Sequence, residues 1–196
     1  MSPPLLTVGH GRLDADQLGA LLRQAKVGLL VDVRRFPGSR ANPAVARDAL
    51  PSWLPEVGID YRWDERLGGR RRLPDASGGS RRDGARDVPR DGEGEETDSW
   101  WRVEQFRAYA AHTRSAEFAA AMAGLFAEVD AGSARVAVMC SESVWWRCHR
   151  RLIADVTALG HDRPVEHLMH DGRLVEHPVA EGARRVDEGV LVWDGR

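Results

Sequence analysis

Residues Val136–Arg151 read VAVMCSESVWWRCHRR, and this segment decides both the fold class and the candidate site. An apolar run ends at Cys140, a polar turn follows, and a helix is expected to open at Arg147. Both cysteines of the chain lie here. In α/β proteins, ligands bind where a strand ends and a helix begins, because free backbone N–H groups and the positive helix end converge there. The segment therefore predicts an α/β fold with a site beside Cys140.

Composition excludes several classes of protein. A length of 196 residues fits one domain, and 42% hydrophobic residues are enough for a sizeable core. The net charge of −2 gives no global electrostatic reason to bind nucleic acid, although Lys26 is the only lysine and arginine supplies every other basic side chain. Two cysteines do not make a secreted disulfide framework, and no apolar run approaches the roughly 20 residues of a membrane helix. We expect a cytoplasmic protein, with no signal peptide, membrane contact or cofactor.

Strand-like and helix-like patterns alternate along the chain. Asp14 and Gln17 form a capping-box pattern before one amphipathic helix, and Ser115 can cap another. Residues 44–57 are weakly helical, and a further helix is expected to end at Gly160. Apolar runs typical of strands occupy Leu5–Val8, Gly28–Val33, Ile59–Trp63, Arg135–Met139 and, as the last strand, Pro164–Leu168.

This alternation predicts a single α/β domain over residues 1–178, with a central, mostly parallel sheet flanked by helices on both faces. Residues 74–99 are almost free of apolar side chains, so they are expected to form a flexible insertion rich in Gly, Arg and acidic residues. Residues 179–196 read as a polar C-terminal tail, in which Val190–Trp193 is a candidate docking patch.

Loops after successive strands carry polar side chains. Because the carboxyl ends of parallel strands meet at one sheet edge, His10, Asp32 and the turn at Cys140 are expected to converge. Several arginines around one pocket favour an anion such as phosphate or carboxylate. The predicted anion-binding residues are Arg12, Arg34, Ser39, Arg40, Arg70, Arg147 and Arg150.

Cys140 is the predicted nucleophile or redox thiol, because a nearby helix N-terminus and Arg147 would stabilise its thiolate. His10 or His149 would move protons, and Glu142 or Asp32 would orient them. The leading hypothesis is an enzyme that acts on a nucleotide, a nucleic acid or another phosphate-bearing substrate. The alternative for Cys140 is a small, buried residue at a strand end.

Two other functions stay open. A non-catalytic nucleic-acid-binding module would use the Leu67–Arg72 loop and the tryptophan pairs Trp100–Trp101 and Trp145–Trp146, and it would lose roughly tenfold or more of its affinity between about 50 and 200 mM salt. A metal-binding protein would take zinc or iron on Cys140, Cys148, His149 and His10. Cys148 precedes Leu152 by one helical turn, so it is otherwise expected to pack in the core.

Several motifs occur together in one order: Thr7–Arg12, Asp32–Arg34, Pro37–Arg40, Asn42–Pro43, Leu67–Arg71, Phe106–Ala110, Met139–Glu142 and Trp146–Arg150. In this order they resemble the domain-of-unknown-function 488 family. The resemblance spans about residues 5–170. It implies a cytoplasmic α/β domain, and it implies no particular reaction.

Overall fold

Five short strands pair in parallel at the centre of the structure, a computed structural model that describes residues 3–38, 42–72, 97–132 and 134–196. The strand order is β3-β2-β4-β1-β5-β6, and only β6 runs antiparallel to its neighbour. The predicted α/β fold with a mostly parallel sheet is confirmed. The strands are β1 Leu5–Gly9, β2 Val27–Asp32, β3 Asp60–Trp63, β4 Arg135–Cys140, β5 Val165–Leu168 and β6 Leu174–Glu176.

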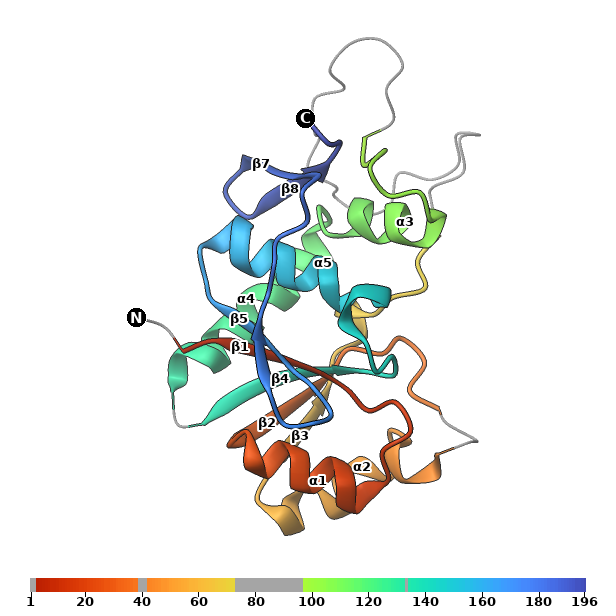
Figure 1. The fold of residues 1–196 in the computed structure, drawn as a ribbon, viewed down its shortest axis with the longest axis vertical. Coiled ribbons are helices and arrows are strands. Elements are labelled where there is room, and N and C mark those ends of the chain that lie inside the picture. The colour runs from red at the N-terminus through yellow and green to blue at the C-terminus, as the bar shows by residue number, and fades with distance from the viewer. Residues whose placement is uncertain (1–2, 39–41, 73–96, 133) are drawn as a thin grey trace.

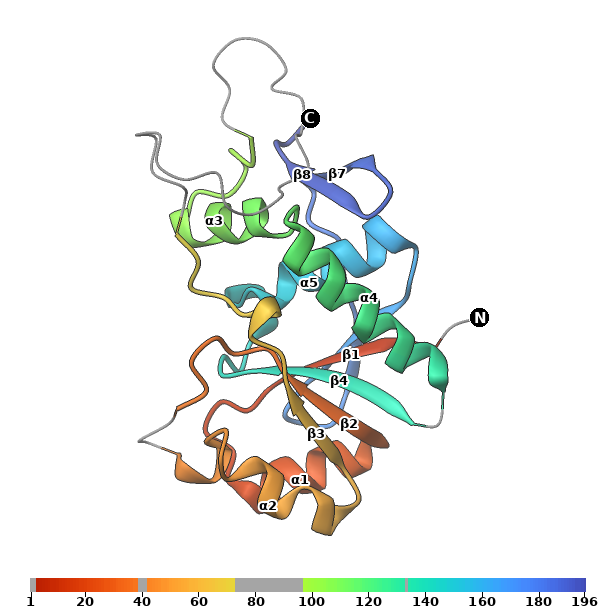
Figure 2. The ribbon, with the colours of Figure 1, turned by 180° about the vertical axis from the view of Figure 1, so that it is seen from behind.

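Helices cover both faces of this sheet (Figure 1). On one face lie α1 (Ala15–Gln24) and α2 (Leu50–Trp53), and on the other lie α3 (Glu104–His112), α4 (Ala116–Ala131) and α5 (Arg150–Asp155). The reverse view shows α4 running across the sheet (Figure 2). The predicted caps form: the Asp14 carboxylate accepts the backbone N–H of Gln17, and the Ser115 hydroxyl accepts that of Phe118.

The sheet separates two apolar cores. Successive strand residues point to opposite faces, so Val8, Leu30 and Met139 pack toward α1. Val138 and Cys140 belong to the other core, which contains residues of α3, α4 and α5. The same alternation determines which polar side chains lie on the same face of the sheet and can therefore contact one another.

The chain leaves β1 and β4 in opposite directions. From β1 it passes through α1 to β2, whereas from β4 it passes through α5, on the other face, to β5. The two strand ends lie side by side, since the backbone N–H of His10 donates to Cys140 O and that of Gly11 donates to Ser141 O, both at 3.0 Å. Open α/β sheets bind ligands at such a switch point.

The C-terminal segment is built into the fold. The sequence predicted Pro164–Leu168 as the last strand, and this prediction is wrong. Strand β6 follows it, and then a hairpin of β7 (Ala183–Asp187) and β8 (Val190–Trp193). The Val190–Trp193 patch is buried, and Trp193 Nε1 donates to Asp155 Oδ2 at 2.9 Å. The sequence identified this apolar patch as a candidate docking patch, but the polar composition around it gave no sign of the β7–β8 hairpin.

The predicted insertion is shorter at its C-terminal end than composition indicated. Residues 73–96 lie outside the described residues, but residues 97–99 are described. Asp98 is buried, pairs with Arg114 at 2.6 Å and accepts the backbone N–H of Trp193 at 3.1 Å. A carboxylate fixed by a distant arginine cannot be recognised from local composition. In the part of the chain that is described, no helix is both long and apolar enough to cross a bilayer.

Trp193→Ala is expected to lower the free energy of unfolding by about 3–5 kcal/mol, because it leaves a cavity and removes a donor from the buried Asp155 carboxylate. Urea unfolding measures this loss. The half-exposed Trp146 is the matched control, and Trp146→Ala should change stability by about 0.5 kcal/mol or less. Equal losses for the two variants would show that the hairpin does not support the core.

Candidate functional site

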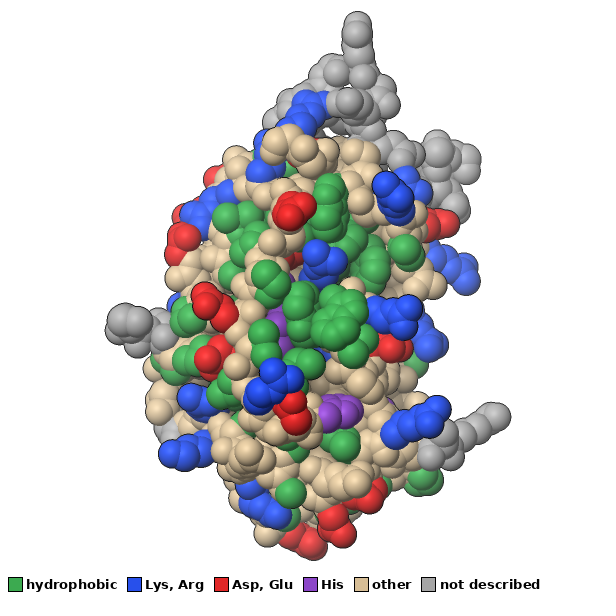
Figure 3. All heavy atoms as spheres, viewed as in Figure 1, with side chains coloured by type: hydrophobic (Ala, Val, Ile, Leu, Met, Phe, Trp, Pro, Cys, Tyr) green, Lys and Arg blue, Asp and Glu red, His purple; other side chains and the backbone are tan. Residues whose placement is uncertain are grey.

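A cavity of about 760 Å³ lies beside the carboxyl ends of β2 and β4. Its walls come from the turn after β2, the loop 69–72, the start of α3 and the segment between β4 and α5. In Figure 3, basic side chains lie along the right-hand side. Figure 1, which has the same view, shows α3 and the segment after β4 on that side. The charged lining residues are Arg34, Arg35, Arg70, Arg71, Arg72, Arg147, Glu104 and Glu142. The lining is therefore strongly cationic.

Two sulfurs and an imidazole form one wall of this cavity. His149 Nδ1 lies 3.7 Å from Cys140 Sγ and 3.6 Å from Cys148 Sγ. The other ring nitrogen, Nε2, lies 3.0 Å from Val33 O. A carbonyl oxygen only accepts, so Nε2 carries the proton and the lone pair of Nδ1 faces the sulfurs. Cys140, Cys148 and His149 are called the sulfur–histidine cluster below.

Packing holds His149 in this orientation. The ring of Tyr109 lies 5.0 Å from the His149 ring, and the Tyr109 hydroxyl donates to Leu67 O at 2.6 Å. A Cβ added at Gly69 would come within 2.7 Å of His149 Nδ1. The lack of a side chain at Gly69 therefore lets the backbone of this loop approach the imidazole.

The two thiols do not share the same acidity. The hydrogen bond with Cys148, together with burial, raises the pKa of Cys140 to about 12. Burial by itself would raise the pKa of Cys148, but the hydrogen bond from Cys140 and the charge and hydrogen bonds of Arg150 lower it to about 6. These opposite shifts favour Cys148 over Cys140 as the thiolate, whereas the sequence predicted Cys140 as the nucleophile or redox thiol.

After the hydrogen bond from Cys140, Arg150 contributes most to the lowered pKa of Cys148. The Arg150 side chain is almost fully buried, and it donates to Glu142 O at 2.5 Å and to Thr7 Oγ1 at 3.4 Å. Within the described residues no carboxylate forms an ion pair with it, and its charge and hydrogen bonds act on Cys148. Arg150 does not line the cavity. The geometry therefore gives Arg150 a structural role, whereas the sequence predicted that it would bind an incoming anion.

A second polar cluster occupies the opposite face of the sheet. Arg34 donates to the buried carboxylate of Asp32 at 2.8 and 2.5 Å and approaches His10 Nε2 at 3.2 Å. Tyr61 also donates to Asp32, at 3.0 Å. Because these groups satisfy one another, the Arg34 guanidinium is not available to bind an anion as predicted, and Asp32 orients Arg34 rather than a catalytic histidine.

His10 belongs to this second cluster. Val8 points toward α1, so His10, two residues later, points to the same face, whereas Cys140 faces α5. Burial and then the charge of Arg34 lower the pKa of His10 to about 4. The predicted grouping of His10 with the two cysteines, as proton carrier or metal ligand, is therefore not formed, although the backbones of His10 and Cys140 are hydrogen-bonded.

The remaining predicted residues divide by position. Arg70, Arg147 and Glu142 are exposed and line the cavity, whereas the exposed Arg12 is not among its lining residues. Ser39 and Arg40 lie outside the described residues.

Sequence reasoning did not single out two residues of the site, Arg35 and Tyr109. Cys148 is buried in the core that contains Leu152, as expected, although α5 begins only at Arg150 and residues 145–147 form a separate 3-10 turn. The sequence pointed to Cys148 as a functional residue only in the metal-binding alternative, through its place beside His149.

Most of the tryptophans are occupied inside the fold. Trp101 is buried against Trp193, and Trp145 stacks on His167 with ring centroids 4.2 Å apart. In the two predicted pairs, Trp100–Trp101 and Trp145–Trp146, only Trp146 offers a large free face, since it is 46% exposed. This arrangement weakens the alternative in which paired tryptophans stack on nucleic-acid bases.

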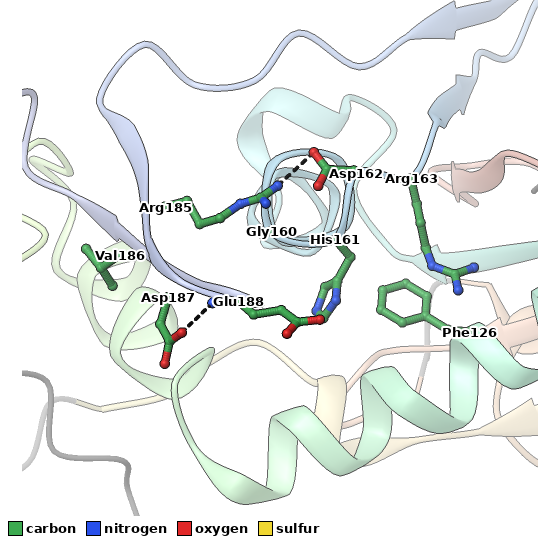
Figure 4. A pocket seen from close by; sticks show the side chains of 9 residues that line it. All are labelled: Phe126, Gly160, His161, Asp162, Arg163, Arg185, Val186, Asp187 and Glu188. Atoms are coloured by element: carbon green, nitrogen blue, oxygen red, sulfur yellow. Dashed lines mark hydrogen bonds and ion pairs between the residues drawn. The ribbon is translucent and has the colours of Figure 1, made fainter.

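Another hollow, of about 610 Å³, lies beside Phe126 and the β7–β8 hairpin (Figure 4). Its arginines are already neutralised, since Arg163 pairs with Asp130 and Arg185 pairs with Asp162, each at 2.7 Å. The cavity at β2 and β4 is therefore the stronger candidate for binding a charged ligand.

The model of one protein family, described as domain of unknown function DUF488, matches residues 14–157 of the 196-residue chain. The chain belongs to the DUF488 family. The match includes both cysteines, His149 and all the arginines that line the cavity. No curated protein and no solved structure matches the sequence significantly. Membership confirms the resemblance seen in the sequence, and the family description assigns no reaction.

With a chelator present, a small alkylating reagent is expected to label Cys148 with a pH midpoint near 6, because thiolate is the reactive form. Peptide mass spectrometry at a series of pH values measures the labelling of each cysteine. In Cys140→Ser, which replaces a thiol donor by a hydroxyl, Cys148 should keep its labelling. A midpoint near the ordinary thiol value of about 8.5 would contradict this assignment.

Acid is expected to destabilise the fold between pH 6.5 and about 4. Burial, first of all, lowers the pKa of His10 and His112 to about 4 and that of His167 to about 3. The unfolded chain, with histidine pKa values near 6.5, then binds more protons, so stability rises with pH across this window and is lost as pH falls. Urea midpoints measured against pH test this. His10→Asn should flatten the slope, and an unchanged slope would contradict the assignment of His10.

Proposed function

We propose that this protein is an enzyme acting on a phosphate-bearing substrate, such as a nucleotide, a nucleic acid or a smaller phosphate ester. One observation carries the proposal: an arginine-lined cavity has a sulfur–histidine cluster in its wall. The arginines would bind the anionic group, and the cluster would supply the reacting groups.

The charge of the cavity favours an anion. Arg35, Arg70, Arg72 and Arg147 line it, and among the described residues none of them has an ion-pair partner. Burial, followed by the charge of Arg35, lowers the pKa of Arg71, which shows that the cations repel one another. A bound phosphate would relieve this repulsion, and a planar guanidinium can donate two parallel hydrogen bonds to phosphate oxygens.

The cluster provides groups suited to covalent and acid–base chemistry. The Cys148 sulfur would act as the nucleophilic or redox thiol, in place of Cys140 as predicted from sequence. His149 Nδ1, which faces the two sulfurs, would serve as the proton acceptor, since Nε2 is fixed on Val33 O. Glu142 lines the same cavity and could orient a substrate hydroxyl or water. His10, Asp32 and Arg34 would stabilise the neighbouring loop instead.

Binding of inorganic phosphate, measured by calorimetry, tests the role of the arginines. Arg147→Glu and Arg70→Glu should each weaken phosphate binding about tenfold or more, because each removes a charged donor and adds repulsion. Arg23→Glu, on the exposed side of α1, makes the same charge change away from the cavity and should leave the affinity unchanged. Equal effects in all three variants would mean that only net charge matters.

Turnover tests the enzymatic part. A panel of nucleotides, sugar phosphates and phosphodiesters is incubated with the protein, and products are followed by phosphorus NMR. We expect turnover of at least one class, lost in His149→Ala. The non-catalytic alternative predicts no turnover, together with nucleic-acid binding that weakens roughly tenfold or more between about 50 and 200 mM salt. That combination of results would overturn the enzyme proposal.

A further inference from the structure

We propose that Cys140, Cys148 and His149 bind one Zn²⁺ ion, with a fourth coordination position open to the arginine-lined cavity. The proposal that zinc binds rests only on the geometry of these three side chains. The use of the open position rests on the proposed function, because it requires a phosphate-bearing substrate in the cavity.

The spacing of the three donor atoms fits tetrahedral zinc. With Zn–S near 2.3 Å and Zn–N near 2.0–2.1 Å, two ligands of a tetrahedron lie about 3.6 Å apart. The observed separations between sulfur and nitrogen are 3.7 Å for Cys140 and 3.6 Å for Cys148. All three donor atoms lie within 4.8 Å of one another. An ion can therefore be placed between them with only small side-chain movements.

The surroundings of His149 are those of a metal ligand. Ligating histidines usually donate the second ring N–H to a carbonyl or carboxylate, which fixes the tautomer and the ring orientation. Here Nε2 donates to Val33 O, so the lone pair of Nδ1 is already directed at the two sulfurs. Tyr109 packs on the ring, and the lack of a Cβ at Gly69 leaves room for it.

The donor set selects a thiophilic ion. Two thiolates and one imidazole suit zinc and discriminate against magnesium and calcium, which prefer oxygen ligands. Both sulfurs bind as thiolates, so near neutral pH the proton of the Cys140 thiol is released to solvent when the ion enters. Two thiolates neutralise a divalent cation, and Arg150, which approaches Cys148, can donate a hydrogen bond to a coordinated sulfur.

Three protein ligands with a fourth position open are the arrangement of catalytic rather than structural zinc. All three side chains line the cavity, so the open position faces the space enclosed by Arg35, Arg70 and Arg147. A phosphate held there could coordinate the ion through one oxygen, and the ion would then polarise the phosphoryl group. Alternatively, an attacking water could take the open position, and the ion would acidify that water. In this state the sulfurs are ligands, and water replaces Cys148 as the nucleophile.

Cobalt titration of the metal-stripped full chain tests the site. Co²⁺ should bind at one ion per chain, with thiolate-to-cobalt charge transfer in the near ultraviolet and the strong visible bands of tetrahedral cobalt, and one equivalent of Zn²⁺ should remove both signals. Cys140→Ser, Cys148→Ser and His149→Ala should each weaken binding by about 100-fold or more, since loss of an outer partner alone costs 10–100-fold. His161→Ala, which removes an imidazole outside the cluster, should keep wild-type binding.

Circular dichroism shows whether each variant folds. If a variant does not fold, the cobalt spectrum of the wild-type protein still tests whether the site exists. Octahedral cobalt without charge transfer in the wild type, or wild-type binding in Cys140→Ser and Cys148→Ser, would overturn the zinc site. Arg147→Glu separates this outcome from failure of the proposed function, because it should weaken phosphate binding and leave the cobalt spectrum unchanged. Normal phosphate binding without a cobalt site would reject zinc alone, and a cobalt site without phosphate binding would reject the phosphate proposal.

Discussion

The close approach of the end of β1 to the turn after β4 is the constraint on which the site depends. Two backbone hydrogen bonds of 3.0 Å join these segments. A Cβ added at Gly9 would lie only 1.8 Å from Glu142 O, so only glycine allows this contact. The same carbonyl accepts from the buried guanidinium of Arg150, which in turn lies next to Cys148. One tight contact therefore fixes the switch point of the sheet, the buried cation and the position of the thiolate.

The two-residue period of a strand sorts the polar residues of the sheet edge into two groups. Asp32 and His10 fall on the α1 face, where Arg34 neutralises the carboxylate. Cys140 falls on the α5 face, where its sulfur meets His149. Proximity along the edge is therefore not enough for two groups to react, because the sheet itself stands between them.

Charge distribution links the framework to the cavity. Arginines with carboxylate partners, such as Arg34 and Arg114, hold loops and the C-terminal hairpin in place. Other arginines line the cavity and, among the described residues, have no carboxylate partner; Arg70 and Arg147 are examples, and they leave a positive field next to the cluster. The proposed phosphate ligand and the open position of the proposed zinc ion both lie in this field.

The sequence by itself determined the five parallel strands and the caps of α1 and α4, because these follow from local periodicity and from hydrogen bonds between near neighbours. It also predicted a site after β4. It also pointed to Cys140, His149, Arg70 and Arg147 as members of the site. It could not decide that Cys148 carries the thiolate, that Arg34 and Arg150 are internal, or that His10 is separated from the sulfurs. Some of their partners are distant in the chain: Arg34 contacts His10, 24 residues away, and Arg150 contacts Thr7, 143 residues away. Only the tertiary structure brings such partners together, since burial and hydrogen bonding between distant segments set both the charge and the direction of each side chain.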